Sequence, residues 1–424
     1  MKSIVLVLAG LLLTSAQVSA QTGPTGTWKV ETVGWEMFLR MEGSTLTGLV
    51  SHCTTFFPAP VDIEDANITG NAINFKCTSP DHDRTLTFTG RVNGDEIVLT
   101  WEKHVRDGGF DNGPSDKIFG PSAPRQFTAK RVSDGELAKA ADEVRGLEFV
   151  AAVNLLSKDV KAEGFLFVPR KVSRARAVIV VIRYGLGFSV TDSPSWRKLA
   201  ESIDAPLLSV RFSSIRPSPV IGSVNWADGG ADALLSVLQR LAQESGHPEL
   251  VDAPFVIWGH SGGGGAASIL AGLNPKRTLA FVRYHSGPLS GDINVVSRIP
   301  ALFFAGGQDQ TSPPQVGETL WKTGRALGAP WTFVVEPAAT HGDAKDAEMA
   351  NELMIPWITA VVRQRLSPDG ASLRVVTEGS AWMGNNRTGE VAPYGTFTGS
   401  KPDASWLPDG LSAQGWRRVL GATR

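Results

Sequence analysis

Three residues of the kinds that form a hydrolytic triad occur along this sequence in the order serine, aspartate, histidine: Ser261, Asp309 and His341. Each follows a short apolar run of the kind that forms a buried strand. Because open α/β sheets bind ligands beyond the carboxyl ends of their strands, the three side chains are expected at one edge of one sheet. A serine hydroxyl needs a base to take its proton and a carboxylate to orient that base. The order and the placement therefore predict nucleophilic chemistry at Ser261.

Ser261 lies in a Gly-x-Ser-x-Gly motif, residues 259–263, between the apolar run 255–258 and the small-residue segment 264–271. A strand, this motif and a helix in succession are typical of a nucleophile elbow. The turn is strained and leaves no room for side chains beside the serine, which accounts for the glycines. It also points the first N–H groups of the helix toward the hydroxyl. The same motif occurs by chance in glycine loops, but Asp309 and His341 downstream favour the elbow.

With these residues, segment 150–366 resembles the α/β-hydrolase superfamily, in its serine esterase and dienelactone-hydrolase-like branch. The resemblance implies a doubly wound, mostly parallel sheet and no cofactor. It also implies that Ser261 is the nucleophile, His341 the general base, and Asp309 the carboxylate that orients the imidazole. Dienelactone hydrolases carry cysteine at the elbow, and the serine here favours ordinary ester cleavage. Asp343, two residues past the histidine, is a weaker candidate for the acid.

The oxyanion hole is expected from two backbone N–H groups. One is that of Gly262, at the start of the elbow helix. The resemblance implies that the second comes from the loop after the third strand of the hydrolase domain, where Leu186 is the expected donor. In this loop Tyr184 stands where the superfamily often has a histidine, and we expect it to line the substrate site.

Three arginines follow apolar runs that end near the same edge of the sheet: Arg183, Arg211 and Arg283. A buried cation needs a partner, so each either pairs with a nearby acid or binds a substrate carboxylate through its bidentate fork. The second alternative predicts a preference for esters that bear an acidic group. His285 also follows a strand end and is a further candidate for the substrate pocket.

The chain begins with a basic residue, an apolar run at 4–13 and small residues before Gln21, which together predict a signal peptide at residues 1–20. The apolar run is too short to span a bilayer, and no later stretch approaches a membrane span. The alternative is a buried N-terminal helix. The expected location is secreted or periplasmic.

Residues 24–131 alternate between polar and apolar with turn signals between the runs, which predicts a small all-β barrel or sandwich domain. No catalytic constellation occurs in it, and both polymer binding and packing on the enzyme stay open. Residues 132–149 are expected to form a polar helical linker. Residues 367–424 form an extension rich in tryptophan, which we expect to pack on the catalytic domain.

The composition, with 42% hydrophobic and 20% charged residues, is that of a globular protein. A formal net charge of −1 argues against a nucleic-acid partner or an anionic-membrane surface. Cys53 and Cys77 are the only cysteines, and in an exported chain they are expected to pair, the alternative being two buried thiols. The histidines near them lack metal-ligand spacing, so no metal site is expected.

The sequence thus predicts a secreted serine ester hydrolase that works through an acyl-enzyme on a small-molecule or polymer-derived ester. Two alternatives remain. A serine peptidase can use the same fold and triad, and a binding protein can keep the fold without the activity.

Overall fold

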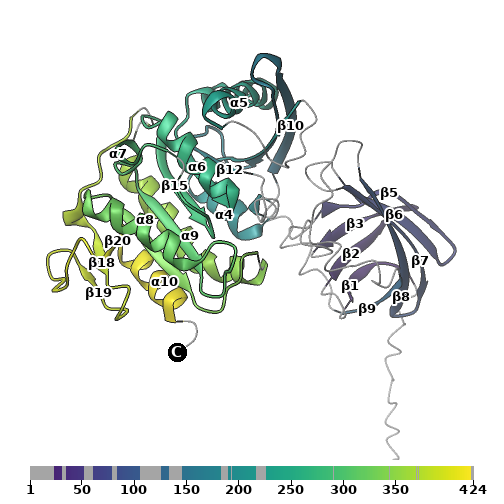
Figure 1. The fold of residues 1–424 in the computed structure, drawn as a ribbon. Coiled ribbons are helices and arrows are strands. Elements are labelled where there is room, and N and C mark those ends of the chain that lie inside the picture. The colour runs from purple at the N-terminus through teal and green to yellow at the C-terminus, as the bar shows by residue number, and fades with distance from the viewer. Residues whose placement is uncertain are drawn as a thin grey trace, which may run out of the picture.

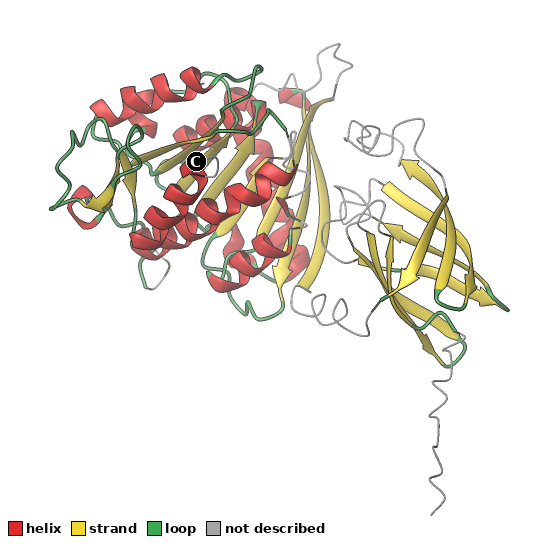
Figure 2. Cartoon of the chain, turned by 90° about the horizontal axis from the view of Figure 1, so that it is seen from below, coloured by secondary structure: helices red, strands yellow, loops and turns green. Residues whose placement is uncertain are grey.

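The structure is a computed structural model, and it describes residues 23–30, 35–51, 61–78, 84–105, 126–132, 146–182, 190–191, 193–215, 226–289, 291–342, 344–368, 370 and 372–421. The expected signal peptide, residues 133–145 of the expected linker and the loop 183–189 lie outside these ranges. Figures 1 and 2 show that the described strands form two separate bodies, one made of strands alone and one of strands and helices.

In the described part of the N-terminal body, nine antiparallel strands form sheet A in the order β4-β3-β2-β1-β9-β8-β7-β6-β5. The end strands β4 and β5 are separated along the chain only by Ile63, whose N–H donates to the carbonyl of Gly48 in β3 at 3.0 Å. The two ends of the sheet therefore meet, and of the two predicted forms this is the barrel. The strands are β1 (Gly26–Val30), β2 (Trp35–Glu42), β3 (Thr45–Ser51), β4 (Val61–Asp62), β5 (Glu64–Thr69), β6 (Ala72–Thr78), β7 (Arg84–Asn93), β8 (Glu96–Val105) and β9 (Gln126–Arg131).

Alternate residues of these strands fill the barrel, as the period of a strand requires. Trp28 is completely buried there, and the rings of Phe75 and Phe88 stack with centroids 5.0 Å apart. Cys77 on β6 is completely buried in the same core. Cys53 lies outside the described residues, so the bridge between the two cysteines stays a prediction.

The second body contains sheet B, with eight strands in the order β10-β11-β13-β12-β14-β15-β16-β17. β11 runs antiparallel to both of its neighbours, and the strands from β13 to β17 are parallel. This is the α/β-hydrolase fold that the resemblance implies. The strands are β10 (Gly146–Leu155), β11 (Val160–Pro169), β12 (Val178–Ile182), β13 (Leu207–Ser214), β14 (Phe255–His260), β15 (Thr278–Tyr284), β16 (Ala301–Gly306) and β17 (Trp331–Glu336).

The helical linker expected at 132–149 is wrong at its carboxyl end. Residues 146–149 are the first residues of β10, which forms an antiparallel hairpin with β11 from the Gly146–Pro169 pair to the Leu155–Val160 pair. β10 is an edge strand with mostly exposed or half-buried side chains, and the polar residues that suggested a helix precede it in the chain.

Helices cover both faces of sheet B. On β12, Val180 faces the layer of α5, α6 and α8, whereas its neighbours Ile179 and Val181 face the layer of α4, α9 and α10. Both faces of the strand are thus buried, as expected for a parallel sheet. Among the described residues, no helix is both long and apolar enough to cross a bilayer. The helices are α4 (Pro194–Ser202), α5 (Ala231–Ser245), α6 (Gly262–Leu273), α7 (Ile293–Val296), α8 (Pro314–Ala326), α9 (Ala344–Arg365) and α10 (Gly410–Gly421).

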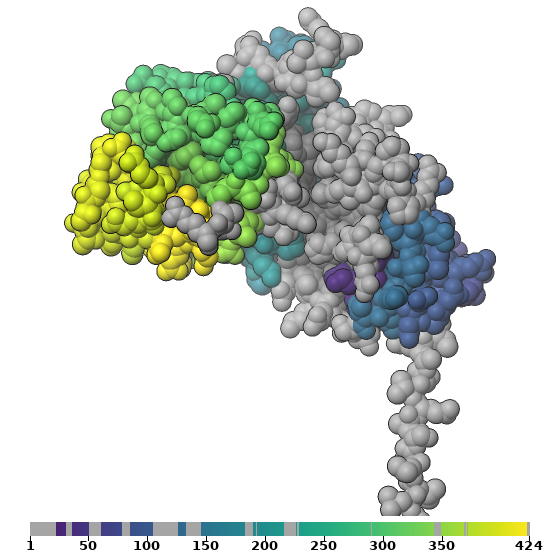
Figure 3. Space-filling view, turned by 60° about the horizontal axis from the view of Figure 1, so that its bottom comes forward, coloured from purple at the N-terminus to yellow at the C-terminus, as the bar shows by residue number. Residues whose placement is uncertain are grey.

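The C-terminal extension packs against β17, the last strand of sheet B. Its small sheet consists of β18 (Trp382–Gly384), β19 (Val391–Pro393) and β20 (Ser405–Leu407), and α10 follows it. Ser405 Oγ and Trp416 Nε1 donate to the carbonyl of Phe333 in β17, at 2.9 and 2.8 Å. Figure 3 shows this yellow segment lying against the green part of the domain.

Candidate active site

Ser261 stands between the end of β14 and the start of α6, with φ +54° and ψ −124°. A positive φ is strained for a residue with a side chain, and such strain is found at functional turns. The turn has no room for a side chain at Gly259, where a Cβ would lie 2.0 Å from the carbonyl oxygen of Gly263. The sharp turn leaves the Ser261 side chain half-buried at the carboxyl edge of sheet B.

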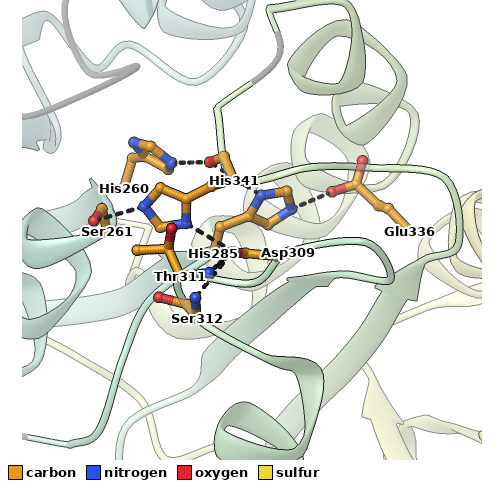
Figure 4. A network of polar contacts seen from close by, with 8 residues as sticks. All are labelled: His260, Ser261, His285, Asp309, Thr311, Ser312, Glu336 and His341. Atoms are coloured by element: carbon orange, nitrogen blue, oxygen red, sulfur yellow. Dashed lines mark hydrogen bonds and ion pairs between the residues drawn. The ribbon is translucent and has the colours of Figure 1, made fainter.

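The three residues predicted to act together are joined by two hydrogen-bonding contacts, both made by His341 (Figure 4). His341, in the loop after β17, has Nε2 2.9 Å from Ser261 Oγ and Nδ1 2.8 Å from Asp309 Oδ2. Asp309 follows β16, so the three side chains come from the ends of three strands of one sheet. Asp343, the weaker candidate for the acid, lies outside the described residues.

Asp309 is held as a carboxylate. Its side chain is completely buried, whereas that of His341 is 26% exposed. Burial opposes ionisation of Asp309, but hydrogen bonds from the Ser312 N–H, the His341 ring and the Thr311 N–H outweigh it, and the pKa lies below its usual value. Both backbone N–H groups donate to Oδ1 at 2.8 Å, which leaves Oδ2 for the imidazole. This arrangement orients His341 with its second nitrogen toward the serine.

Gly262 is the first residue of α6, so its N–H has no acceptor within the helix. Gly262 is exposed and directly follows Ser261, which is where an oxyanion donor is expected. The other residues expected in this role or beside the substrate, Leu186, Tyr184 and Arg183, lie outside the described residues.

Arg211 does not stand at a strand end as expected. β13 continues to Ser214, because it pairs with the long strand β11, and this places Arg211 directly opposite Glu163. The two side chains form an ion pair, and both are mostly buried. Burial opposes ionisation of Glu163, but contacts with Lys161 and Arg211 outweigh it and lower its pKa. Arg211 therefore pairs with an acid, which was the alternative to substrate binding.

Arg283 on β15 is 2% exposed, and the acceptors that its guanidinium meets among the described residues are hydroxyl and carbonyl oxygens. Its guanidinium donates to Ser268 Oγ, to Ser286 Oγ at 3.2 Å, and to the carbonyls of Gly287 and Pro288, the latter at 3.0 Å. Burial lowers its pKa to about 10. Arg283 thus holds the loop that follows β15 through hydrogen bonds. It neither pairs with an acid among the described residues nor presents its guanidinium to a substrate.

His285 was expected to line the substrate pocket, but its side chain is completely buried. Its backbone has φ +43°, which turns the chain at the end of β15. Its Nε2 lies 2.9 Å from Glu336 Oε2, at the end of β17. From the sequence, Glu336 was one of the nearby acids that an arginine could pair with, and the structure pairs it with His285 instead. The one available signal for this pairing was that Glu336 also ends an apolar strand at this edge.

His260, the variable residue of the elbow motif, was expected to pack or to form a hydrogen bond. Its Nε2 lies 2.5 Å from the main-chain carbonyl oxygen of His341. Although three histidines lie at this edge, the described residues contain no group of three or more His, Cys, Asp or Glu that could hold a metal ion.

No family model matches the chain, and no curated protein matches it. Solved structures similar to it include Est1E from Butyrivibrio proteoclasticus, with 12% identity and a TM-score of 0.36 over 52% of this chain and 100% of that one. An esterase from Pyrobaculum calidifontis is 13% identical, with a TM-score of 0.38 over 53% and 89%. An acylaminoacyl peptidase from Pyrococcus horikoshii is 9% identical, with a TM-score of 0.42 over 76% of this chain and only 61% of that one. Such likeness concerns the fold alone.

Proposed function

We propose that this chain, which has the α/β-hydrolase fold, is a serine ester hydrolase whose nucleophile is Ser261. The observation that carries the proposal is the continuous line of hydrogen-bonding contacts from Ser261 Oγ through the His341 ring to Asp309. A carboxylate can only accept a hydrogen bond, so the His341 nitrogen that faces Asp309 donates. The other ring nitrogen can then accept the proton of the Ser261 hydroxyl. The imidazole is therefore placed to take the proton of the hydroxyl as the general base.

In the proposed reaction, His341 Nε2 takes the proton of Ser261 as the hydroxyl attacks the ester carbonyl. The oxyanion that forms lies beside the start of α6, where the N–H of Gly262 donates to it. His341 then returns the proton to the leaving alcohol, and an acyl group stays on Ser261. Water activated by the same imidazole releases the acid. Asp309 keeps the imidazole in the right tautomer throughout and stabilises its charged form.

The test is a panel of short-chain, aromatic and polymer-derived esters, with matched peptide amides, combined with labelling by a serine-directed fluorophosphonate. We expect ester turnover and a covalent adduct on Ser261, located by peptide mass spectrometry. Faster cleavage of the amides would favour a serine peptidase instead. No turnover and no adduct, with the fold intact by circular dichroism, would favour a binding protein.

The preference for esters that bear an acidic group now depends on Arg183, because Arg211 and Arg283 are engaged elsewhere. We propose that its guanidinium binds the substrate carboxylate through a bidentate contact. A matched neutral and anionic ester pair tests this, with kcat/KM expected to favour the anionic ester. An Arg183→Met variant should lose that preference, and equal values for the pair in the wild-type protein would end the idea.

We also propose that the protein acts outside the cytoplasm, because residues 1–20 have the pattern of a signal peptide. The intact mass of protein recovered from the periplasm or the medium tests this. The expected product begins at Gln21, and an uncleaved chain retained in the cytoplasm would contradict the proposal.

A further inference from the structure

The main chain of the triad histidine is contacted by two other imidazoles. The carbonyl oxygen of His341 lies 2.5 Å from His260 Nε2 and 3.4 Å from His285 Nδ1 (Figure 4). A carbonyl oxygen only accepts hydrogen bonds, so a nitrogen that bonds to it must donate. Two rings from the ends of neighbouring strands thus contact the carbonyl oxygen of His341, whose own ring must stay between Asp309 and Ser261.

His260 is suited to this task because its state is fixed. Its side chain is buried, and burial lowers its pKa to about 3, so the ring is neutral at ordinary pH. A neutral imidazole has one N–H, and the contact with the His341 carbonyl requires that hydrogen on Nε2. The ring packs beside Tyr284, with centroids 5.7 Å apart. The donor therefore has a fixed tautomer and a fixed position.

His285 is fixed in a different way. Its ring stacks on Tyr284 with centroids 4.0 Å apart and an angle of 13°, and its Nε2 is held by Glu336 at 2.9 Å. Glu336 ends β17, and His341 follows five residues later in the loop. The same imidazole thus contacts the side chain at the beginning of this loop and the main chain at His341, and so connects the two.

We propose that His260, His285 and Glu336 are positioning residues that form a carbonyl clamp on His341. The clamp fixes the backbone of a loop residue, and thereby keeps its ring between Asp309 and Ser261. This inference rests on the proposed function for its effect on turnover, although the clamp itself is a matter of geometry. A displacement of about 1 Å in such an arrangement costs on the order of a hundredfold in rate.

The test compares two substitutions at one position. His260→Phe keeps an aromatic ring but removes the donor, whereas His260→Gln keeps an N–H group at a similar reach. We expect His260→Phe to lower kcat by about ten- to a hundredfold with KM changed less than about threefold, because the variant displaces the His341 ring but leaves the substrate site unchanged. His260→Gln should recover most of the loss. A purely structural role would show as equal losses in both variants, and unchanged kcat in both would also overturn the clamp.

Glu336→Gln is the second variant, and it keeps the proposal testable if His260→Phe does not fold. It weakens the hold on His285 and should lower kcat by about tenfold, again with little change in KM. The matched control is His247→Gln. His247 also pairs with a glutamate, Glu249 at 2.9 Å, but beside the short helix η3 (Pro248–Val251) that precedes β14 at the opposite end of that strand. Its removal should leave kcat unchanged, and an equal loss there would show that any histidine–glutamate pair matters only for folding.

A measurement without substrate separates this inference from the proposed function. The proton between His341 Nδ1 and Asp309 should give a low-field proton NMR signal, assigned by its loss in Asp309→Asn. We expect the signal to broaden or vanish in His260→Phe and to persist in His260→Gln. If the wild-type protein cleaves no ester, the proposed function fails while this signal still reports on the clamp. A signal unchanged in His260→Phe and in Glu336→Gln would overturn the clamp even in an active enzyme.

Discussion

Two histidine–carboxylate pairs lie at the same edge of sheet B, and they are nearly identical in their own geometry. His341 is 2.8 Å from Asp309, and His285 is 2.9 Å from Glu336; both carboxylate side chains are buried. The difference lies at the second ring nitrogen. In the first pair it meets the hydroxyl of Ser261 and the ring is partly open to solvent, whereas in the second it faces a main-chain carbonyl and the ring is completely buried. A histidine–carboxylate pair is thus not a catalytic group by itself; what its free nitrogen meets decides its role.

The largest effect should come from removing the hydroxyl that the first pair serves. Ser261→Ala should lower kcat on esters by about 10⁶-fold, because it removes the hydroxyl that attacks the ester carbonyl. The fold should persist, since the side chain is half-buried at a turn. Steady-state kinetics and circular dichroism measure the two effects. Ser236→Ala, at a half-buried serine on α5, is the control. A substantial residual rate in a clean preparation of Ser261→Ala would contradict the elbow.

The second prediction contrasts the two carboxylates directly. Asp309→Asn should lower kcat by about 10⁴-fold, because the amide favours the wrong tautomer of the imidazole. The equivalent change in the other pair, Glu336→Gln, should cost only about tenfold, since its imidazole acts through the main chain of His341. Kinetics of the two variants on one ester give the ratio. Comparable losses in the two variants would contradict the view that the group facing the second ring nitrogen decides the role of each pair.

The third prediction concerns pH and the neutral ring between the two pairs. Burial lowers the pKa of His260 from 6.5 to about 3, so between these values the unfolded chain binds more protons than the fold. The free energy of unfolding is therefore full above pH 6.5 and falls on acidification, by up to about 1.4 kcal/mol per pH unit from this group. His260→Gln lacks the titrating ring and should show a shallower fall. Urea unfolding at pH 6, 5 and 4 measures both slopes, and equal slopes would contradict the assigned state of His260.

The smallest effect on turnover should come from the region without such pairs. If Cys53 and Cys77 are bridged, reduction should destabilise the β barrel by about 3–4 kcal/mol on the chain-entropy model and leave kcat unchanged. Mass spectrometry of the unreduced protein shows the bridge, and thermal melting shows its effect. Two thiols that react with an alkylating agent without reductant would exclude the bridge.

The sequence was sufficient for the residues that end strands and poor for the directions that side chains take afterwards. Ser261, Asp309 and His341 could be grouped because the carboxyl ends of parallel strands meet at one edge, whatever the loops do. Arg211 was placed wrongly because antiparallel pairing with β11 extends β13 past it, and the length of a pairing partner is not a local property. His285 was placed wrongly because its ring is buried against Tyr284 and Glu336; Ser286-Gly287-Pro288 after it indicate a turn but not the direction of the ring.

The tail that follows α9 has a consequence for the order in which the parts of the chain can fold. β17 is the last strand in the order of sheet B, and the carbonyl of Phe333 within it accepts hydrogen bonds from Asn386, Ser405 and Trp416, while its N–H donates to Ser405 Oγ. An uncovered edge strand invites pairing with other chains. All three of these partners follow β17 in the chain, so an intermediate that has completed the sheet before the tail packs still presents an open edge. That intermediate, rather than the finished protein, is then the species most prone to aggregate.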